Sequence, residues 1–81
     1  MKPEEVVSAL GFINYEHFAE FKKNTVMGMI AFGDPFLRCL GEALLIAEDR
    51  DAVKIINLFR NECSVHEMLY KMHLAKKSAT E

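Results

Sequence analysis

The chain is predicted to fold as an all-α protein, a compact bundle of four to five helices with short corners. Apolar residues recur at spacings of three and four along most of the chain, which is the period of an amphipathic helix. No segment alternates convincingly with the two-residue period of a strand. Gly, Pro, Asn and Asp stand between the apolar segments, where helices start and stop. With 81 residues, the chain is expected to form a single helical domain, residues 1–81.

Two segments of helical pattern precede the first sharp corner. Pro3 fits the first turn of a short helix that ends at Gly11, and Asn14 is a suitable N-cap for the next segment. Residues 15–32 keep helical spacing throughout. Gly28 is a weak point at which this segment could kink or break, so the pattern leaves open whether it forms one helix or two.

A helix–helix corner is predicted where the sequence reads GDP. Gly33 can take the left-handed conformation that closes one helix, Asp34 can cap the next, and Pro35 fits its first turn. The helix expected at about residues 35–48 has a very broad apolar arc: Phe36, Leu37, Cys39, Leu40, Ala43, Leu44, Ile46 and Ala47. Its remaining strip carries Arg38 and Glu42, an expected i,i+4 ion pair, while Gly41 suggests close approach of another backbone.

Residues 47–55, AEDRDAVKI, crowd three carboxylates into four positions: Glu48, Asp49 and Asp51. A calcium loop that starts at Asp49 would need an oxygen ligand at its fifth position, a glycine at its sixth and a glutamate at its twelfth, and the sequence supplies none of these. The simpler interpretation is a corner at which Asp49 or Asp51 accepts the unpaired N–H groups of the next helix. No metal site is predicted here.

Two further helices are predicted after this corner. Residues 52–62 form an amphipathic pattern, and residues 64–67, SVHE, read as a capping box that opens the last helix. The end of that helix is expected to fray at about residues 77–81. Its buried face is predicted to comprise Val65, Met68, Leu69, Met72 and Ala75, and most methionines of the chain are interpreted as core residues.

Composition favours association with another protein. Apolar residues make up 51% of the sequence, whereas a domain of this size buries only about 60% of the surface that its unfolded chain exposes. Some apolar surface is therefore expected to be covered by a second copy or by a different protein. The net charge of −2 and the pI of 5.9 disfavour general nucleic-acid binding. No apolar run is long enough to span a membrane and no signal-peptide pattern is present, so a cytoplasmic location is expected.

Cysteine and histidine residues match no catalytic or zinc-binding template. Cys39 and Cys63 lie in apolar helical patterns and are interpreted as reduced core thiols. A zinc site built from Cys63, His66 and His73 would require two histidines about 10 Å apart along one helix to share an ion. Nucleophilic catalysis by Cys63 is disfavoured because Glu62 and the helix end would raise its pKa. No enzyme activity, cofactor or metal is predicted.

Protein contact is the preferred function, and a helix-turn-helix nucleic-acid-binding module is the alternative. Such a module would use residues 52–62 and 65–77, but Glu67 would then face phosphate groups in the part of the helix that should be basic. The candidate interaction surface comprises His66, Tyr70, His73, Met27, Gly41 and Leu45. The expected partners are a second copy of the chain, in a homo-oligomer, and a host protein.

Residues 34–59 resemble a segment of small, mostly uncharacterised proteins encoded by bacteriophages and prophages. The matching features are Pro35-Phe36, the core LGEAL at 40–44, the corner of Ala47-Glu48 with Asp51, and the helix from Lys54-Ile55 to Phe59. The resemblance implies an accessory protein or an inhibitor of a host protein that works in the cytoplasm of a bacterial cell. It implies no catalytic residues.

Overall fold

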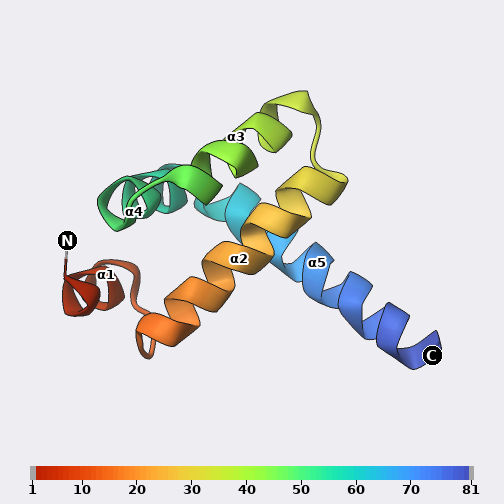
Figure 1. The fold of residues 1–81 in the computed structure, drawn as a ribbon, viewed down its shortest axis with the longest axis horizontal. Coiled ribbons are helices and arrows are strands. Elements are labelled where there is room, and N and C mark those ends of the chain that lie inside the picture. Colours follow the sequence, from red (N-terminus) through yellow and green to blue (C-terminus); the bar gives the residue numbers. More distant parts are fainter. Residues whose placement is uncertain (1, 81) are drawn as a thin grey trace.

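The computed structural model describes residues 2–80, which contain five helices and no strand (Figure 1). They are α1 (Pro3–Leu10), α2 (Tyr15–Phe32), α3 (Pro35–Ile46), α4 (Asp49–Leu58) and α5 (Arg60–Thr80). The helices form one body with principal extents of 40 × 28 × 19 Å. The predicted all-α bundle with short corners is therefore confirmed, and residues 15–32 form one helix rather than two.

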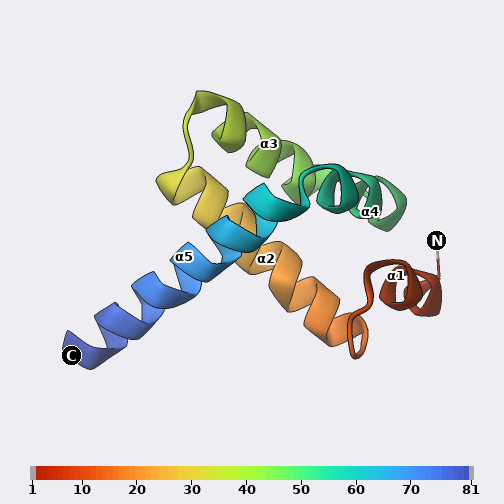
Figure 2. The same ribbon diagram turned by 180° about the vertical axis from the view of Figure 1, so that it is seen from behind.

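Helix α2 is the centre of the fold, because α1, α3 and α5 all pack against it. Helix α5 crosses behind α2 in Figure 1 and in front of it in Figure 2, while α3 packs against another side of α2. Helix α4 contacts α1, α3 and α5 and closes the end of the bundle near the N-terminus. The buried apolar residues come from all five helices: Val6, Leu10, Phe18, Val26, Met29, Leu44, Ala52, Val53, Ile56 and Cys63.

Local capping signals in the sequence place the helix ends. The Asn14 side chain accepts a hydrogen bond from the His17 amide at 2.8 Å, and the Asp34 carboxylate accepts one from the Leu37 amide at 2.9 Å. Gly11 takes the left-handed conformation with φ of 73°. Gly33 does not: its φ of −79° and ψ of 157° are extended, so the left-handed interpretation is wrong there.

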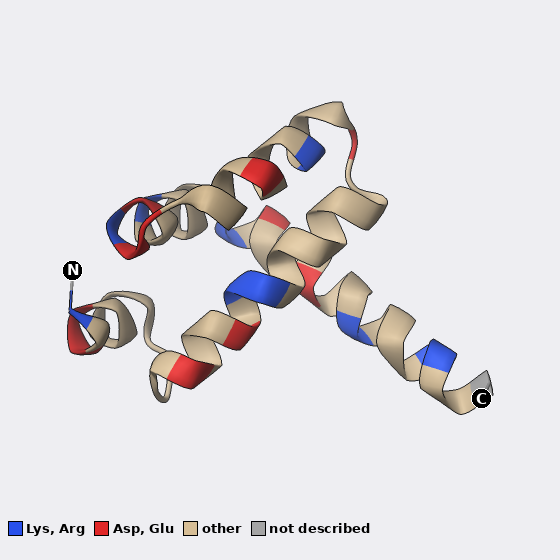
Figure 3. Ribbon diagram, viewed as in Figure 1, with Lys and Arg blue, Asp and Glu red and all other residues tan. Residues whose placement is uncertain are grey.

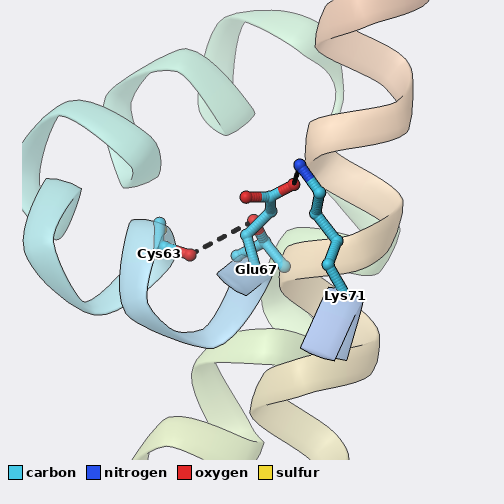
Figure 4. A network of polar contacts seen from close by, with 4 residues as sticks. Cys63, Glu67 and Lys71 are labelled. Atoms are coloured by element: carbon cyan, nitrogen blue, oxygen red, sulfur yellow. Dashed lines mark hydrogen bonds and ion pairs between the residues drawn. The ribbon is translucent and has the colours of Figure 1, made fainter. Parts of the chain in front are cut away.

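Gly28 lies where the backbones of α2 and α5 cross. A Cβ atom built on Gly28 would overlap the carbonyl oxygen of His66 and lie 2.7 Å from its carbonyl carbon. The buried Thr25 hydroxyl, one turn earlier, donates a hydrogen bond to the carbonyl oxygen of Cys63 at 3.4 Å, which Figure 4 shows beside Glu67 and Lys71. The predicted weak point is thus an uninterrupted part of α2, and its glycine allows α5 to approach closely.

The start of the last helix differs from the prediction. Only Phe59 separates α4 from α5, and the Cys63 amide already donates to the Phe59 carbonyl oxygen at 2.9 Å. Ser64 therefore lies inside α5, and the capping-box interpretation of residues 64–67 is wrong. Helix α5 continues through Thr80, beyond the predicted end of its regular part. Residue 81, the last of the predicted frayed tail, lies outside the described residues.

The acidic stretch is a corner, as predicted, but its carboxylates do not cap a helix. Only Ala47 and Glu48 separate α3 from α4, and the N-cap residue Glu48 makes no side-chain capping bond. The Asp49 carboxylate instead accepts hydrogen bonds from the Tyr15 hydroxyl at 2.8 and 3.1 Å. Lys22 Nζ donates to the Ala47 carbonyl oxygen at 3.0 Å. These two contacts fix the corner to α2, and sequence spacing gave no sign of either.

The face of α5 that was predicted to be buried is exposed. Val65, Met68, Leu69, Met72 and Ala75 were expected in the core, yet all of them are exposed. The reason is the crossing geometry: α2 covers α5 around Cys63 and His66, and the C-terminal half of α5 then leads away from the other helices (Figures 1 and 2). Met29 is buried, but Met27, Met68 and Met72 are exposed, so the core interpretation of most methionines is also wrong.

None of the helices within residues 2–80 has both the length and the apolar character needed to cross a membrane.

Candidate functional site

The six residues predicted to form one contact surface do not lie together. Tyr70 and His73 lie on the outer half of α5, Met27 and Leu45 line a groove between α2 and α3, and His66 and Gly41 are buried. The prediction grouped residues from three helices, and the spacing of residues along a sequence does not define how separate helices are placed in space.

His66 and Gly41 are contacts within the fold. His66 is only 8% exposed, and its Nδ1 lies 2.7 Å from the Glu62 carbonyl oxygen. A Cβ atom on Gly41 would lie 2.9 Å from Met29 Cβ and 3.4 Å from the Val26 carbonyl oxygen. The close backbone approach predicted at Gly41 is therefore confirmed, but the approaching helix is α2 of the same chain. The prediction that these two residues are available to a partner is wrong.

Met27 and Leu45 line one side of a surface groove. Its volume is about 260 Å³, and it lies between α2 and the end of α3. The lining residues are Tyr15, Phe18, Ala19, Lys22, Lys23, Val26, Met27 and Leu45. Apolar side chains form most of this lining. The volume is slightly below the range of about 300–1,000 Å³ that is usual for small-molecule sites, so the groove suits one or two side chains of a protein better.

Tyr70 and His73 belong to an aromatic cluster between α5 and the end of α2. The His73 ring packs edge-on against Phe32, with 5.7 Å between ring centroids, and Tyr70 lies 6.4 Å from His73 by the same measure. On the same side of α5, Leu69 and Met72 border a shallow depression of about 200 Å³ together with Phe32 and His73. Tyr70 and His73 of the predicted surface therefore lie close together, whereas His66 is buried and does not join them.

The outer side of α3 is an apolar surface that sequence reasoning missed. Phe36, Cys39, Ala43 and Ile46, here called the α3 stripe, are all exposed, with exposed fractions of 61% for Phe36 and 84% for Ile46. Leu37, Gly41 and Leu44 lie on the other side of the helix, where they are buried or half-buried. The signal was present in the sequence: an apolar arc this broad exceeds what a single neighbouring helix can cover.

Cys39 and Cys63 have opposite environments. Cys63 is fully buried at the crossing of α2 and α5, which confirms its core assignment, whereas Cys39 is exposed, so the core assignment is wrong for it. Burial, and secondarily the nearby Glu62 carboxylate, raises the pKa of the Cys63 thiol to about 11. Cys63 is therefore protonated at neutral pH. Among the described residues, no group of three or more His, Cys, Asp or Glu side chains is placed to hold a metal ion.

The charged residues of α3 flank the α3 stripe. This helix carries one basic and one acidic residue (Figure 3), Arg38 and Glu42, and both are exposed according to their accessible surface. They do not form the predicted i,i+4 ion pair. A pair of this kind does form in α5, where Lys71 Nζ lies 3.4 Å from Glu67 Oε2 (Figure 4). Arg38 and Glu42 are thus available to contact groups outside the chain.

Comparison with known proteins gives no family for this chain: no family model matches it, and no curated protein or solved structure is significantly similar to it.

Proposed function

We propose that this chain is a small non-catalytic helical protein that acts through protein–protein contacts and self-associates. The observation that carries the proposal is the amount of apolar surface left uncovered. In residues 2–80, 13 large apolar side chains are exposed, whereas the buried apolar core has only ten residues. Single exposed apolar residues are ordinary on protein surfaces, but contiguous patches of them mark interaction sites.

Many of these exposed residues gather on three surfaces: the α3 stripe, the groove beside Met27 and Leu45, and the C-terminal half of α5. Burying one large apolar side chain contributes roughly 1.5–3 kcal/mol. Association costs an estimated 4–15 kcal/mol in lost translational and rotational freedom. Two large side chains from each of two copies are therefore enough to offset the lower part of that cost, and each of the three surfaces offers at least this many.

The nucleic-acid alternative has less support. The predicted recognition helix, residues 65–77, lies within α5, and its N-terminal residue His66 is buried against α2 rather than available to a groove of DNA. Catalysis has no visible centre either, because the Cys63 thiol is buried and protonated at neutral pH.

The experiment has two parts that use the full chain. Light scattering after size-exclusion chromatography, over a range of loading concentrations, should show a mass that rises above the monomer mass of 9.3 kDa. A tagged pull-down from bacterial lysate, with mass spectrometry of the eluate, tests for the host protein implied by the resemblance of residues 34–59 to phage-encoded proteins. A monomeric chain that captures no stoichiometric protein would contradict the proposal.

A further inference from the structure

We infer that two copies of this chain associate through the α3 stripe, as an antiparallel helix pair related by a two-fold axis near Gly41. The inference rests on the proposed self-association and specifies its surface and geometry. Three features support it: the spacing of the apolar residues, the arrangement of charge beside them and the exposed area.

The α3 stripe has the spacing of a helix–helix seam. Its members Phe36, Cys39, Ala43 and Ile46 are separated by three, four and three residues, the repeat of the core positions in a coiled coil. In an antiparallel pair whose two-fold axis passes near Gly41, Phe36 lies opposite Ile46 of the second copy and Cys39 lies opposite Ala43 of the second copy. Symmetry repeats both layers. The small pair at the centre lets the backbones approach, and the large pair closes each end.

Charge favours the antiparallel orientation over the parallel one. Arg38 and Glu42 lie one turn apart on the same flank of the stripe, both exposed and not paired with each other. A two-fold axis near Gly41 places Glu42 of each copy beside both Arg38 and Glu42 of the other, so two opposite-charge contacts form around one like-charge contact. A parallel pair would instead place the flank with Arg38 and Glu42 beside the uncharged flank of the second copy, which carries Leu40, so no such contacts would form. The interface is thus self-complementary, as a two-fold contact requires.

The outer half of α5 is a poorer surface for self-association. It also exposes apolar residues, Met72 and Leu74. However, its Lys71 is already paired with Glu67 of the same chain at 3.4 Å, so this segment lacks the unpaired opposite charges, one turn apart, that α3 offers to a second copy. A second copy therefore fits α3 better than α5.

The exposed area indicates a reversible dimer. Helix α3 has 12 residues and is about 18 Å long. Its stripe, with the stems of the flanking side chains, offers roughly 400 Å² per copy, about half of the contribution of each partner in an interface of standard size. An interface of this size belongs with weak, transient complexes, so the dimer is expected to form reversibly and to dissociate on dilution.

The first test reverses the flanking charges. Arg38→Glu and Glu42→Arg each replace two attractive contacts by two repulsive ones, so each variant alone should dimerise about tenfold more weakly than the natural chain. When the two variants are mixed, acidic and basic flanks face each other and the dimer should return. Sedimentation velocity of each variant and of the mixture measures this, and circular dichroism shows whether both exposed substitutions leave the helices intact.

The second test uses the exposed thiol of Cys39. In the Ala43→Cys variant, mild oxidation should give a disulfide between Cys39 of one copy and the introduced thiol of the other, because these positions face each other. Mass spectrometry of the non-reduced dimer identifies the bond. The matched control is Met68→Cys on α5, where a new exposed thiol should give little cross-linked dimer.

Each contrary outcome has a defined meaning. A dimer whose affinity is unchanged by either charge reversal, or one that cross-links efficiently through Met68→Cys, would overturn the α3 interface while leaving self-association in place. In the Ala43→Cys variant, a disulfide between the Cys39 residues of the two copies, formed in preference to the bond with the introduced thiol, would overturn the antiparallel orientation. A natural chain that stays monomeric up to millimolar concentration would overturn self-association together with this interface.

Discussion

Gly28→Ala is the substitution that tests the crossing of α2 and α5 most severely. In an ordinary helix interior this change stabilises, because alanine has a helix propensity about 1 kcal/mol more favourable than glycine. Here the added Cβ would overlap the His66 carbonyl oxygen and lie 2.7 Å from the carbonyl carbon. These are backbone atoms of α5, which cannot move aside by a side-chain rotation, so the two helices must separate.

The expected effect can be estimated from these two opposing terms. Overpacking a closely packed contact typically costs 1–3 kcal/mol, and a backbone-to-backbone contact belongs at or above the upper end of that range, about 3 kcal/mol. After subtraction of the propensity gain of about 1 kcal/mol, the free energy of unfolding should fall by about 2 kcal/mol. For a domain of this size, that lowers Tm by roughly 8–16 °C.

Thermal unfolding followed by circular dichroism at low protein concentration measures the change in the monomer. The matched control is Ala31→Gly, an exposed position in the same helix, which reports the propensity difference alone and should lower stability by about 1 kcal/mol. Because propensity alone predicts a higher Tm for Gly28→Ala, the sign of the shift decides. A Tm equal to or above that of the natural chain would refute the close crossing.

Three further predictions concern other contacts of the fold. Asp34→Ala removes the N-cap bond to the Leu37 amide and should lower the free energy of unfolding by about 1 kcal/mol in a urea titration; an unchanged midpoint would show that the cap contributes nothing. The hydrogen bond to the Asp49 carboxylate, followed by burial, raises the pKa of the Tyr15 hydroxyl above its ordinary value of 10.0. The unfolded chain therefore loses this proton first, and the free energy of unfolding should fall as pH rises above about 10. Tyr15→Phe should reduce this loss of stability at alkaline pH, and a pH profile identical to that of the natural chain would contradict the contact. Maleimide should label the Cys39 thiol in the native protein and the Cys63 thiol only after unfolding, because Cys63 is buried and burial raises its pKa to about 11. Mass spectrometry measures the two labelling rates, and equal rates would contradict the burial of Cys63.

Helix identity and most helix ends were predictable because their causes are local. The Asn14 and Asp34 side chains bond to amides three residues ahead, and Gly11 adopts a left-handed turn within one helix end. Such signals need no knowledge of the rest of the chain. Where a local signal competes with a continuing helix, as in SVHE at 64–67, the pattern alone misplaced the boundary, because the chain had already turned at Phe59.

Burial was less predictable because it depends on the angles at which the helices meet. Val65 and Met68 have the spacing of core residues, but α2 crosses α5 near His66 and leaves them uncovered. The same crossing buries His66, which its sequence position suggested as a surface residue. For α3, the sequence showed that the apolar arc is broad but could not show which part of it is buried. In the structure α2 covers one side of the helix and leaves Phe36 and Ile46 exposed.

Self-association is the claim on which the function proposed for this chain depends, and sedimentation equilibrium of the natural chain measures it directly. The average mass should rise with concentration from the monomer value of 9.3 kDa toward twice that value, with a midpoint below the millimolar range. A mass that stays at the monomer value up to millimolar concentration would contradict self-association and with it the proposed use of the exposed apolar surface by a second copy.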